Sequence, residues 1–257
     1  MRIAMGIEYD GSDFAGWQVQ AEERTVQGCL ESAVARVADH PVRVQCAGRT
    51  DTGVHALGQV IHFDSDAPRS PRAWLLGTNS NLPPDVAVRW AQPVSEEFHA
   101  RFTARRRAYR YVIFNATARS ALYRRRACWD HRPLDRDRMA AGAGYLVGEH
   151  DFSSYRALGC QAKSPVRTVN RLDVGRQGDY LFIDIEANAF LHHMVRNIAG
   201  VLMTIGAGDK PPAWAAEILG YRDRTLGGVT APPQGLFLMS VTYPDHFLIP
   251  DPGIALF

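Results

Sequence analysis

A pair of alternating segments joined by a short glycine turn is the feature that most constrains how this chain can fold. Residues 168–177, TVNRLDVGRQ, and residues 180–188, YLFIDIEAN, alternate apolar and polar side chains and are separated only by Gly178 and Asp179. Two residues can join only antiparallel neighbours, because parallel strands need a crossover of a dozen or more residues. The sequence therefore predicts an antiparallel hairpin and excludes an all-helical fold.

Segments with helical periodicity alternate with further strand segments along the chain. This alternation predicts an α+β fold, and a chain of 257 residues with 46% hydrophobic content can bury two moderate cores. We expect two halves, residues 1–105 and residues 106–257. Helices are expected over 25–40, 71–82, 134–148, 190–206 and 211–220, and further strands over 2–9, 42–48, 58–64, 85–92, 101–114 and 235–244.

The composition also limits where the protein works. The N-terminal residues lack the basic region and long apolar run of a secretion signal, and no apolar stretch approaches the roughly 20 residues that span a bilayer. The four cysteines show neither C-x-x-C nor mixed His/Cys ligand spacing, which favours reduced thiols over disulfides or zinc. We expect a cytoplasmic protein that binds no membrane.

The charges are distributed unevenly, although the net charge is only +2. Residues 101–138 hold twelve arginines and three aspartates, a local charge of 12 − 3 = +9, which leaves 2 − 9 = −7 for the remainder. A block of this kind favours a polyanionic partner such as a nucleic acid.

The segment AGRTDTGVHALGQVIHF, residues 47–63, places Asp51 between an arginine and a glycine just before a predicted strand. An Asp-x-Gly sequence is typical of an ordinary turn. The triplet DTG also occurs in aspartic peptidases, but those enzymes need two carboxylates that share a proton, and this chain has one such triplet. Arg49 would lower the pKa of the Asp51 carboxyl and keep it ionised, which suits a nucleophile.

Two other segments carry side chains suited to binding a nucleotide. Along RRRAYRYVIF, strand alternation places Tyr109 and Tyr111 on one face and Arg110 on the other. A ring beside guanidinium groups can stack an exposed base while its phosphate is held, although strand aromatics are also typical of a core.

The segment NAFLHHMVRNIAG, residues 188–200, is expected to be helical. Its polar edge would present His192, His193, Arg196 and Asn197, a pattern that also fits an ordinary solvated face. Neighbouring histidines diverge on a helix and no third ligand lies nearby in sequence, so we expect no metal site.

Taken together, six segments resemble the TruA family of tRNA pseudouridine synthases, in the same order along nearly the whole chain. They are YDGSDFAGWQ (9–18), GRTDTGVHALGQVIHF (48–63), NSNLPPDVAVRW (79–90), FHARFTARRRAYRYVI (98–113), ANAFLHHMVRNIAG (187–200) and GLFLMSVTYP (235–244).

This resemblance implies an isomerase that converts uridine to pseudouridine at positions 38, 39 and 40 of the tRNA anticodon stem-loop, without a cofactor or metal. It implies a homodimer with the pseudouridine synthase fold, a curved, mixed and largely antiparallel sheet in two similar halves flanked by helices around a basic cleft. A non-enzymatic RNA-binding module would share the basic block, but it would have no use for an ionised aspartate in a positive cleft.

The resemblance also implies a role for individual residues. Asp51 resembles the catalytic nucleophile, and Tyr109 resembles the tyrosine that stacks against the target uracil. Arg196 resembles the arginine that pairs with that aspartate, and Leu236 the apolar residue at the floor of the pocket. Whether the carboxylate attacks C1′ of the ribose or C6 of the uracil is left open.

Overall fold

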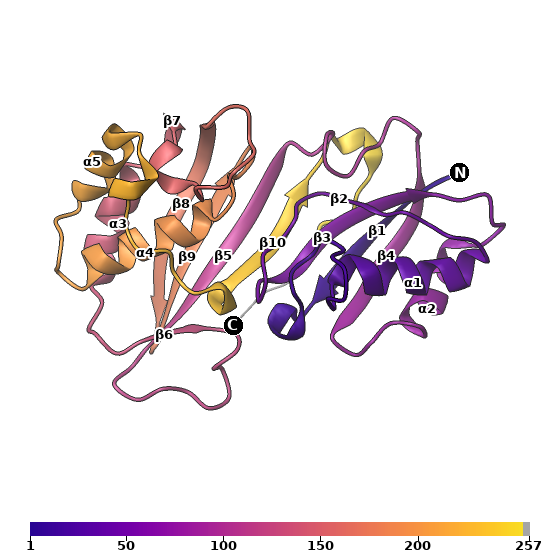
Figure 1. Cartoon of the computed structure of the whole chain (residues 1–257), viewed down its shortest axis with the longest axis horizontal. Coiled ribbons are helices and arrows are strands. Elements are labelled where there is room, and N and C mark those ends of the chain that lie inside the picture. The colour runs from indigo at the N-terminus through magenta and orange to yellow at the C-terminus, as the bar shows by residue number, and fades with distance from the viewer. Residues whose placement is uncertain (254–257) are drawn as a thin grey trace. The chain divides into compact units, whose positions relative to one another are not determined.

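The computed structural model describes residues 1–253, and they form two units (Figure 1). Unit 1 contains Met1–Arg105 together with the segment that begins at Phe237, and unit 2 contains Arg106–Leu236. From the sequence we expected two halves that meet between residues 105 and 106. Our assignment of the C-terminal segment to the second half is wrong, because its strand pairs with a strand of unit 1.

The sheet of unit 1 has the strand order β4-β1-β3-β10, and β2 also pairs with β3. β1 pairs antiparallel with both β3 and β4, whereas β10 runs parallel to β3, with Phe237 opposite His55. The strands are β1 (Arg2–Tyr9), β2 (Gln45–Cys46), β3 (His55–Asp64), β4 (Val86–Val94) and β10 (Leu236–Thr242).

The helices of unit 1 begin where the sequence places capping residues. In α1 (Val26–Ala38), the Thr25 side chain accepts the Gly28 N–H, and in α2 (Pro71–Asn79) the Ser70 side chain accepts the Ala73 N–H. The helices pack on each other and α2 packs on β4. The core includes Trp74, whose ring meets Phe63 with 5.1 Å between centroids. Two 3₁₀ turns complete the unit: η1 (Gly11–Asp13) and η5 (Asp245–Phe247).

The sheet of unit 2 has the antiparallel order β5-β9-β8-β7, with β6 parallel to β5 at its edge. The predicted hairpin is confirmed: β8 and β9 meet at Gly178, whose φ of 56° suits glycine. The strands are β5 (Arg106–Asn115), β6 (Cys128–Asp130), β7 (Gly148–Asp151), β8 (Val166–Gln177) and β9 (Tyr180–Ala187).

Helices cover one face of the unit 2 sheet. The helices α3 and α4 pack on each other, α3 contacts β8, and α4 contacts β5. The elements are α3 (Arg136–Gly144), α4 (Met194–Gly206), α5 (Trp214–Tyr221) and the 3₁₀ turns η2 (Ser153–Tyr155), η3 (Arg224–Leu226) and η4 (Pro233–Gly235).

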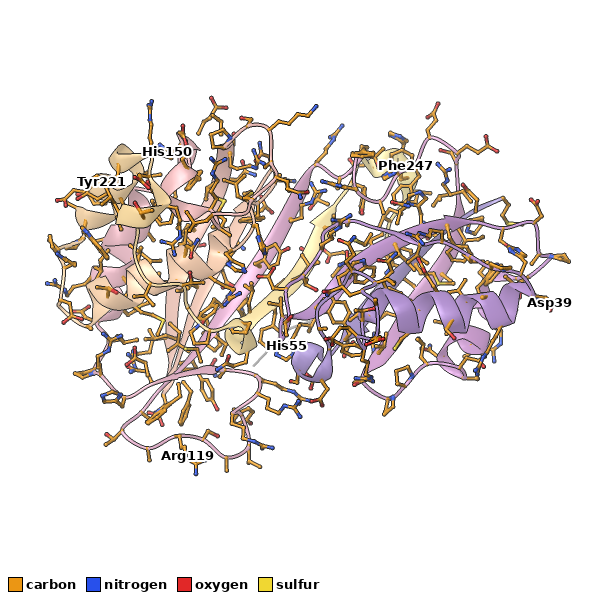
Figure 2. All side chains as sticks on the ribbon, viewed as in Figure 1. Asp39, His55, Arg119, His150, Tyr221 and Phe247 are labelled. Carbon is orange, nitrogen blue, oxygen red and sulfur yellow. The ribbon has the colours of Figure 1, made fainter. Side chains whose placement is uncertain are left out.

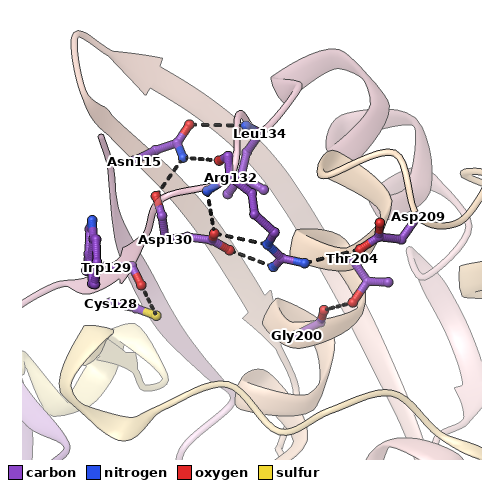
Figure 3. Close-up of polar contacts among 9 residues, drawn as sticks. All are labelled: Asn115, Cys128, Trp129, Asp130, Arg132, Leu134, Gly200, Thr204 and Asp209. Carbon is purple, nitrogen blue, oxygen red and sulfur yellow. Dashed lines mark hydrogen bonds and ion pairs between the residues drawn. The ribbon is translucent and has the colours of Figure 1, made fainter. Parts of the chain in front are cut away.

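A polar network fixes the end of β6 and the turn that follows it (Figure 3). The buried Asp130 carboxylate accepts from the Arg132 backbone N–H at 3.0 Å and from its guanidinium at 2.7 Å. Burial acts to raise the pKa of Asp130, but these hydrogen bonds outweigh it and the pKa is lowered. The Asn115 amide donates to the carbonyl groups of Asp130 and Arg132 and accepts the Leu134 N–H.

The α+β class is confirmed, but several boundaries differ from the predictions. The strand expected over 42–48 is reduced to β2, and β6 and β7 were not predicted. The strand expected from residue 101 begins at Arg106, because residues 99–103 form a turn in which the Thr103 N–H bonds the His99 carbonyl at 3.0 Å. No helix within residues 1–253 is long and apolar enough to cross a membrane. All four cysteines are free thiols.

Candidate functional site

Asp51 lies in a tight turn between β2 and β3 of unit 1. The Val54 N–H bonds the Asp51 carbonyl at 3.1 Å, and Gly53 adopts a φ of 77°, in the left-handed region that favours glycine. The side chain of Asp51 is half-buried. The Asp-x-Gly turn that the sequence predicts is therefore present, and it leaves the carboxylate partly accessible.

The segment after β1 fastens this turn from one side. The Tyr9 hydroxyl and the Thr50 Oγ1 are 2.8 Å apart in a buried hydrogen bond, and the Trp17 N–H donates to the Thr50 carbonyl at 3.0 Å. The residue that precedes Asp51 is thus held by both its side chain and its backbone. A rotation of the turn would break these bonds inside the core, where unpaired polar groups are costly.

Two glycines allow this close approach. A Cβ on Gly11 would lie 2.0 Å from the Val54 carbonyl oxygen, and a Cβ on Gly16 would lie 2.9 Å from the Thr50 carbonyl oxygen. Gly16 also has a φ of 91°. The sequence DGSDFAGW is therefore a backbone cradle, defined here as residues 10–17, that packs directly on the Asp51 turn.

His55 and Gln59 fix the same turn from β3. The Gly11 N–H donates to Nδ1 of the buried His55 at 3.1 Å, which joins the cradle to the first residue of the strand. His55 is labelled in Figure 2. The amide of Gln59, fully buried, donates to the Gly48 carbonyl at 2.6 Å and accepts the Gly48 N–H at 3.3 Å. Both ends of the turn are therefore tied to the sheet.

Arg49 is exposed and lies in the turn two residues before Asp51. Its proposed effect on the charge of that carboxylate remains a prediction.

In unit 2, Tyr109 lies on β5 opposite Ile185 of β9. Its ring is 9% exposed and meets the edge of the Phe190 ring, with centroids 5.0 Å apart at 81°. The register of β5 is continuous, so Tyr109 and Tyr111 share a face, as strand alternation predicts.

Arg196 of α4 lies near that face of β5. Its Nε donates to the Ala231 carbonyl at 2.8 Å, and its own carbonyl accepts the Ala231 N–H at 3.0 Å. The hydroxyl of Tyr111 donates to the carbonyl of the next residue, Pro232, at 2.8 Å. Burial raises the pKa of Tyr111, and the nearby Arg196 acts in the opposite direction. The guanidinium is therefore held at one fixed place beside the strand that carries Tyr109.

The helix that carries Arg196 is shorter than expected. It begins at Met194, and His193, with a φ of 62°, is its first flanking residue. The placement of His192 and His193 on a helical edge is therefore wrong. Asn197 is also not solvated, because its side chain is 2% exposed and donates to the Tyr155 carbonyl at 2.7 Å.

Leu236 is 6% exposed and follows directly on η4 at the start of β10. Of the predicted site residues, Asp51 and Arg49 thus share a turn in unit 1, while Tyr109, Arg196 and Leu236 belong to unit 2.

Sequence reasoning missed the residues that position the Asp51 turn. They are Tyr9, Gly11, Gly16, Thr50, His55 and Gln59. The available signal was the pair of glycines in DGSDFAGW, which marks two points of close backbone approach. The side-chain bonds of Tyr9 and Gln59 carry no local signal, because their partners lie 41 and 11 residues away.

Comparison with known proteins identifies what the chain is similar to. A family model described as tRNA pseudouridine synthase matches residues 5–103 and 143–244. A protein from Alcanivorax borkumensis named tRNA pseudouridine synthase A is 59% identical over 251 residues, which cover 97% of this chain and 94% of the relative. Proteins of the same name from Nitrosococcus oceani and Methylococcus capsulatus are each 60% identical, over 97% and 96% of this chain and 96% and 91% of their own lengths.

Proposed function

This chain belongs to the tRNA pseudouridine synthase family, and on that premise we propose that it isomerises uridine to pseudouridine in tRNA. The observation that carries the proposal is the Asp51 turn, whose backbone is fixed by the cradle and which presents a half-buried aspartate within a segment that the family model matches. We place the reaction in the cytoplasm, as expected from the composition, and at positions 38, 39 and 40 of the anticodon stem-loop, as the resemblance of the motifs implies.

The reaction breaks the bond between N1 of uracil and C1′ of ribose and forms a bond between C5 and C1′. The proton on C5 is released and N1 gains one, so atoms and electrons balance without a cofactor. Asp51 acts as the nucleophile: whether it attacks C1′ of the ribose or C6 of the uracil, its carboxylate forms a covalent bond to the nucleotide. Covalent assistance divides one difficult step into two easier ones. A nucleophile must be held close to its reacting position, and the bonds of Thr50 and Gly48 support this role.

The target uridine must leave its stack before it can react, which requires a few kcal/mol. We propose that Tyr109 stacks on the uracil and offsets roughly 1 to 3 kcal/mol of that requirement. Arg196 pairs with Asp51 and keeps it ionised, and Leu236 forms the apolar floor of the pocket. The fixed guanidinium of Arg196, beside the strand of Tyr109, is what supports this assignment. The pairing of the two units around a basic cleft is part of the same proposal.

The distribution of charge supports tRNA as the substrate. Several arginines of the block over residues 101–138 are paired with acidic side chains, including Arg106 with Glu186 and Arg110 with Asp184. The arginines of residues 119–126 are exposed to solvent. These are the positions from which guanidinium groups can reach phosphates, and binding should weaken steeply as salt is added.

The test compares Asp51→Asn with wild type on tRNA that carries tritium at C5 of uridine. Asp51→Asn should release no tritium above background while its dissociation constant for tRNA stays within a few-fold of wild type. Asp39→Asn is a matched control, because Asp39 is exposed at the end of α1 with a φ of 61° that asparagine tolerates. Turnover by Asp51→Asn would refute the assignment of the nucleophile.

Two further measurements test the finer parts of the proposal. Chemical mapping of pseudouridine in tRNA treated with wild type should place the product at positions 38 to 40, and product at other positions would contradict the proposed specificity. Light scattering should give twice the chain mass of 28.5 kDa if the protein is a homodimer.

A further inference from the structure

Unit 2 contains a pocket of about 230 Å³ beside the segment that joins β5 to β6. Three aromatic side chains and two guanidinium groups line it: Phe114, Tyr123, Trp129, Arg119 and Arg124. Arg119 is labelled on this segment in Figure 2. The space is large enough to hold several water molecules.

The aromatic residues form a row across neighbouring strands. Trp129 of β6 lies opposite Phe114 of β5, and Phe114 lies opposite Tyr180 of β9. Directly opposed residues project from the same face of a sheet. The Tyr180 ring is 5.3 Å from that of Phe114 and 5.6 Å from that of Tyr123, so the row is continuous from strand to loop.

Trp129 is both fixed and accessible. Its indole Nε1 donates to the Ala116 carbonyl at 2.8 Å, and the next residue, Asp130, is buried in the network with Arg132. The side chain nevertheless remains 44% exposed. A ring that is held by its one polar atom and open to solvent is ready to stack on a planar ligand without losing further conformational entropy.

The charge around the pocket is of one sign. Residues 115–129 contain four arginines and no acidic residue, and Arg119, Arg124, Arg125 and Arg126 are all exposed. Exposed arginines beside exposed aromatic rings favour a ligand that has both phosphate and a stacking face.

We propose that this pocket binds one unstacked nucleotide of the RNA substrate, with its base on Trp129 and its phosphate held by Arg119 and Arg124. The bound nucleotide is not the uridine that reacts, because Phe114 and Tyr109 project from opposite faces of β5. The inference rests on the proposed function only in taking RNA as the partner. The pocket adds a second point of attachment and thereby helps to orient the RNA.

The first test measures binding of an unmodified tRNA transcript and of a uridine heptanucleotide. Trp129→Ala should raise the dissociation constant for both by roughly 5- to 150-fold, the effect of one lost stacking contact. Trp129→Phe should restore most of the affinity, because it keeps a ring. Tyr221→Ala is the control, since Tyr221 is 45% exposed at the end of α5 and should bind as wild type.

The second test uses signals that a structural defect would not produce. The heptanucleotide should quench tryptophan fluorescence in wild type and less in Trp129→Phe. Arg119→Ala and Arg124→Ala should each reduce the slope of log affinity against log salt by about 0.7 for the heptanucleotide. Arg171→Ala, an exposed arginine on β8, should leave the slope unchanged.

These outcomes test nucleotide binding at the pocket independently of pseudouridine formation. Equal affinities and equal quenching for wild type and the Trp129 variants would overturn the inference, even if wild type makes pseudouridine. Loss of affinity in Trp129→Ala would support it, even if wild type were inactive. A pocket that binds protein instead would give neither quenching by the heptanucleotide nor a change in salt slope, and this result would also overturn it.

Discussion

Replacement of Gly11 by alanine tests whether the cradle positions the Asp51 turn. The added Cβ would lie 2.0 Å from the Val54 carbonyl oxygen, whereas such contacts essentially never fall below 3.0 Å. The two backbones must therefore separate by at least 3.0 − 2.0 = 1.0 Å. Because the Val54 N–H bonds the Asp51 carbonyl, this displacement passes directly to the turn.

Two separate effects are expected from this displacement. Overpacking of this kind lowers the free energy of unfolding by about 1 to 3 kcal/mol, which leaves most molecules folded at 25 °C. A misplacement of about 1 Å at a reacting group lowers the rate by about 100-fold. Gly11→Ala should therefore be folded, bind tRNA, and release tritium at saturating tRNA about 100 times more slowly than wild type.

Gly175→Ala is the matched control, because a Cβ at this position of β8 meets nothing within 4 Å. It should keep both the stability and the turnover of wild type. Urea unfolding gives the free energies, and tritium release at saturating tRNA gives kcat. Wild-type kcat in Gly11→Ala would refute the reasoning, because it would show that a displaced turn still delivers the carboxylate.

Three further predictions concern stability. Tyr9→Phe should lower the free energy of unfolding by about 1 kcal/mol, because it removes the buried hydrogen bond to Thr50. Burial, and to a smaller extent the neighbouring His99, lowers the pKa of His62 from 6.5 to about 4, so between these pH values the unfolded chain binds a proton that the folded chain does not. The free energy of unfolding should therefore fall as the pH decreases from about 6.5 to about 4, and it should fall less in His62→Asn. Asp130→Asn should lower the free energy of unfolding, measured with urea at pH 7, by about 2 kcal/mol, because the charge-assisted hydrogen bonds to Arg132 are lost.

Exposed residues of the same types provide the controls for these three variants. Tyr145→Phe, His246→Gln and Asp137→Asn should each stay within about 0.5 kcal/mol of wild type. A flat stability profile of wild type between pH 6.5 and 4 would contradict the burial of a neutral His62. If Tyr9→Phe or Asp130→Asn were as stable as wild type, the hydrogen bond between Tyr9 and Thr50, or that between Asp130 and Arg132, would contribute nothing to the free energy of unfolding.

The elements that the sequence predicts well are those with local physical causes. Thr25 and Ser70 mark the starts of α1 and α2 because each side chain accepts a backbone N–H three residues ahead. Gly53 predicts the turn after Asp51, and Gly178 predicts the hairpin, because both need a positive φ. These signals depend only on residues that are close together in the sequence, so they can be recognised from the sequence alone.

The parts that could not be predicted depend on distant partners. The start of α4 was placed too early because nothing in the local pattern shows that His193 adopts a left-handed conformation. The clasp between Gln59 and Gly48 and the bond between Tyr9 and Thr50 form only when the sheet of unit 1 is assembled. For the same reason the proposed roles of Asp51 and Arg196 rest on the resemblance of whole motifs, whereas the contacts that hold the Asp51 turn and Arg196 are visible only in the structure.

The return of the chain at Phe237 to the first unit has a consequence for synthesis. Unit 2 is continuous in sequence, so it can fold once residue 236 has left the ribosome. The sheet of unit 1, which adjoins the Asp51 turn, lacks its β10 partner until residues 236–242 have emerged, and until then His55 and Ala56 stay unpaired on that side of β3. Unit 1 is therefore completed only after the whole of unit 2 has emerged, and a nascent chain stopped short of residue 237 would expose an unfinished strand edge to other chains.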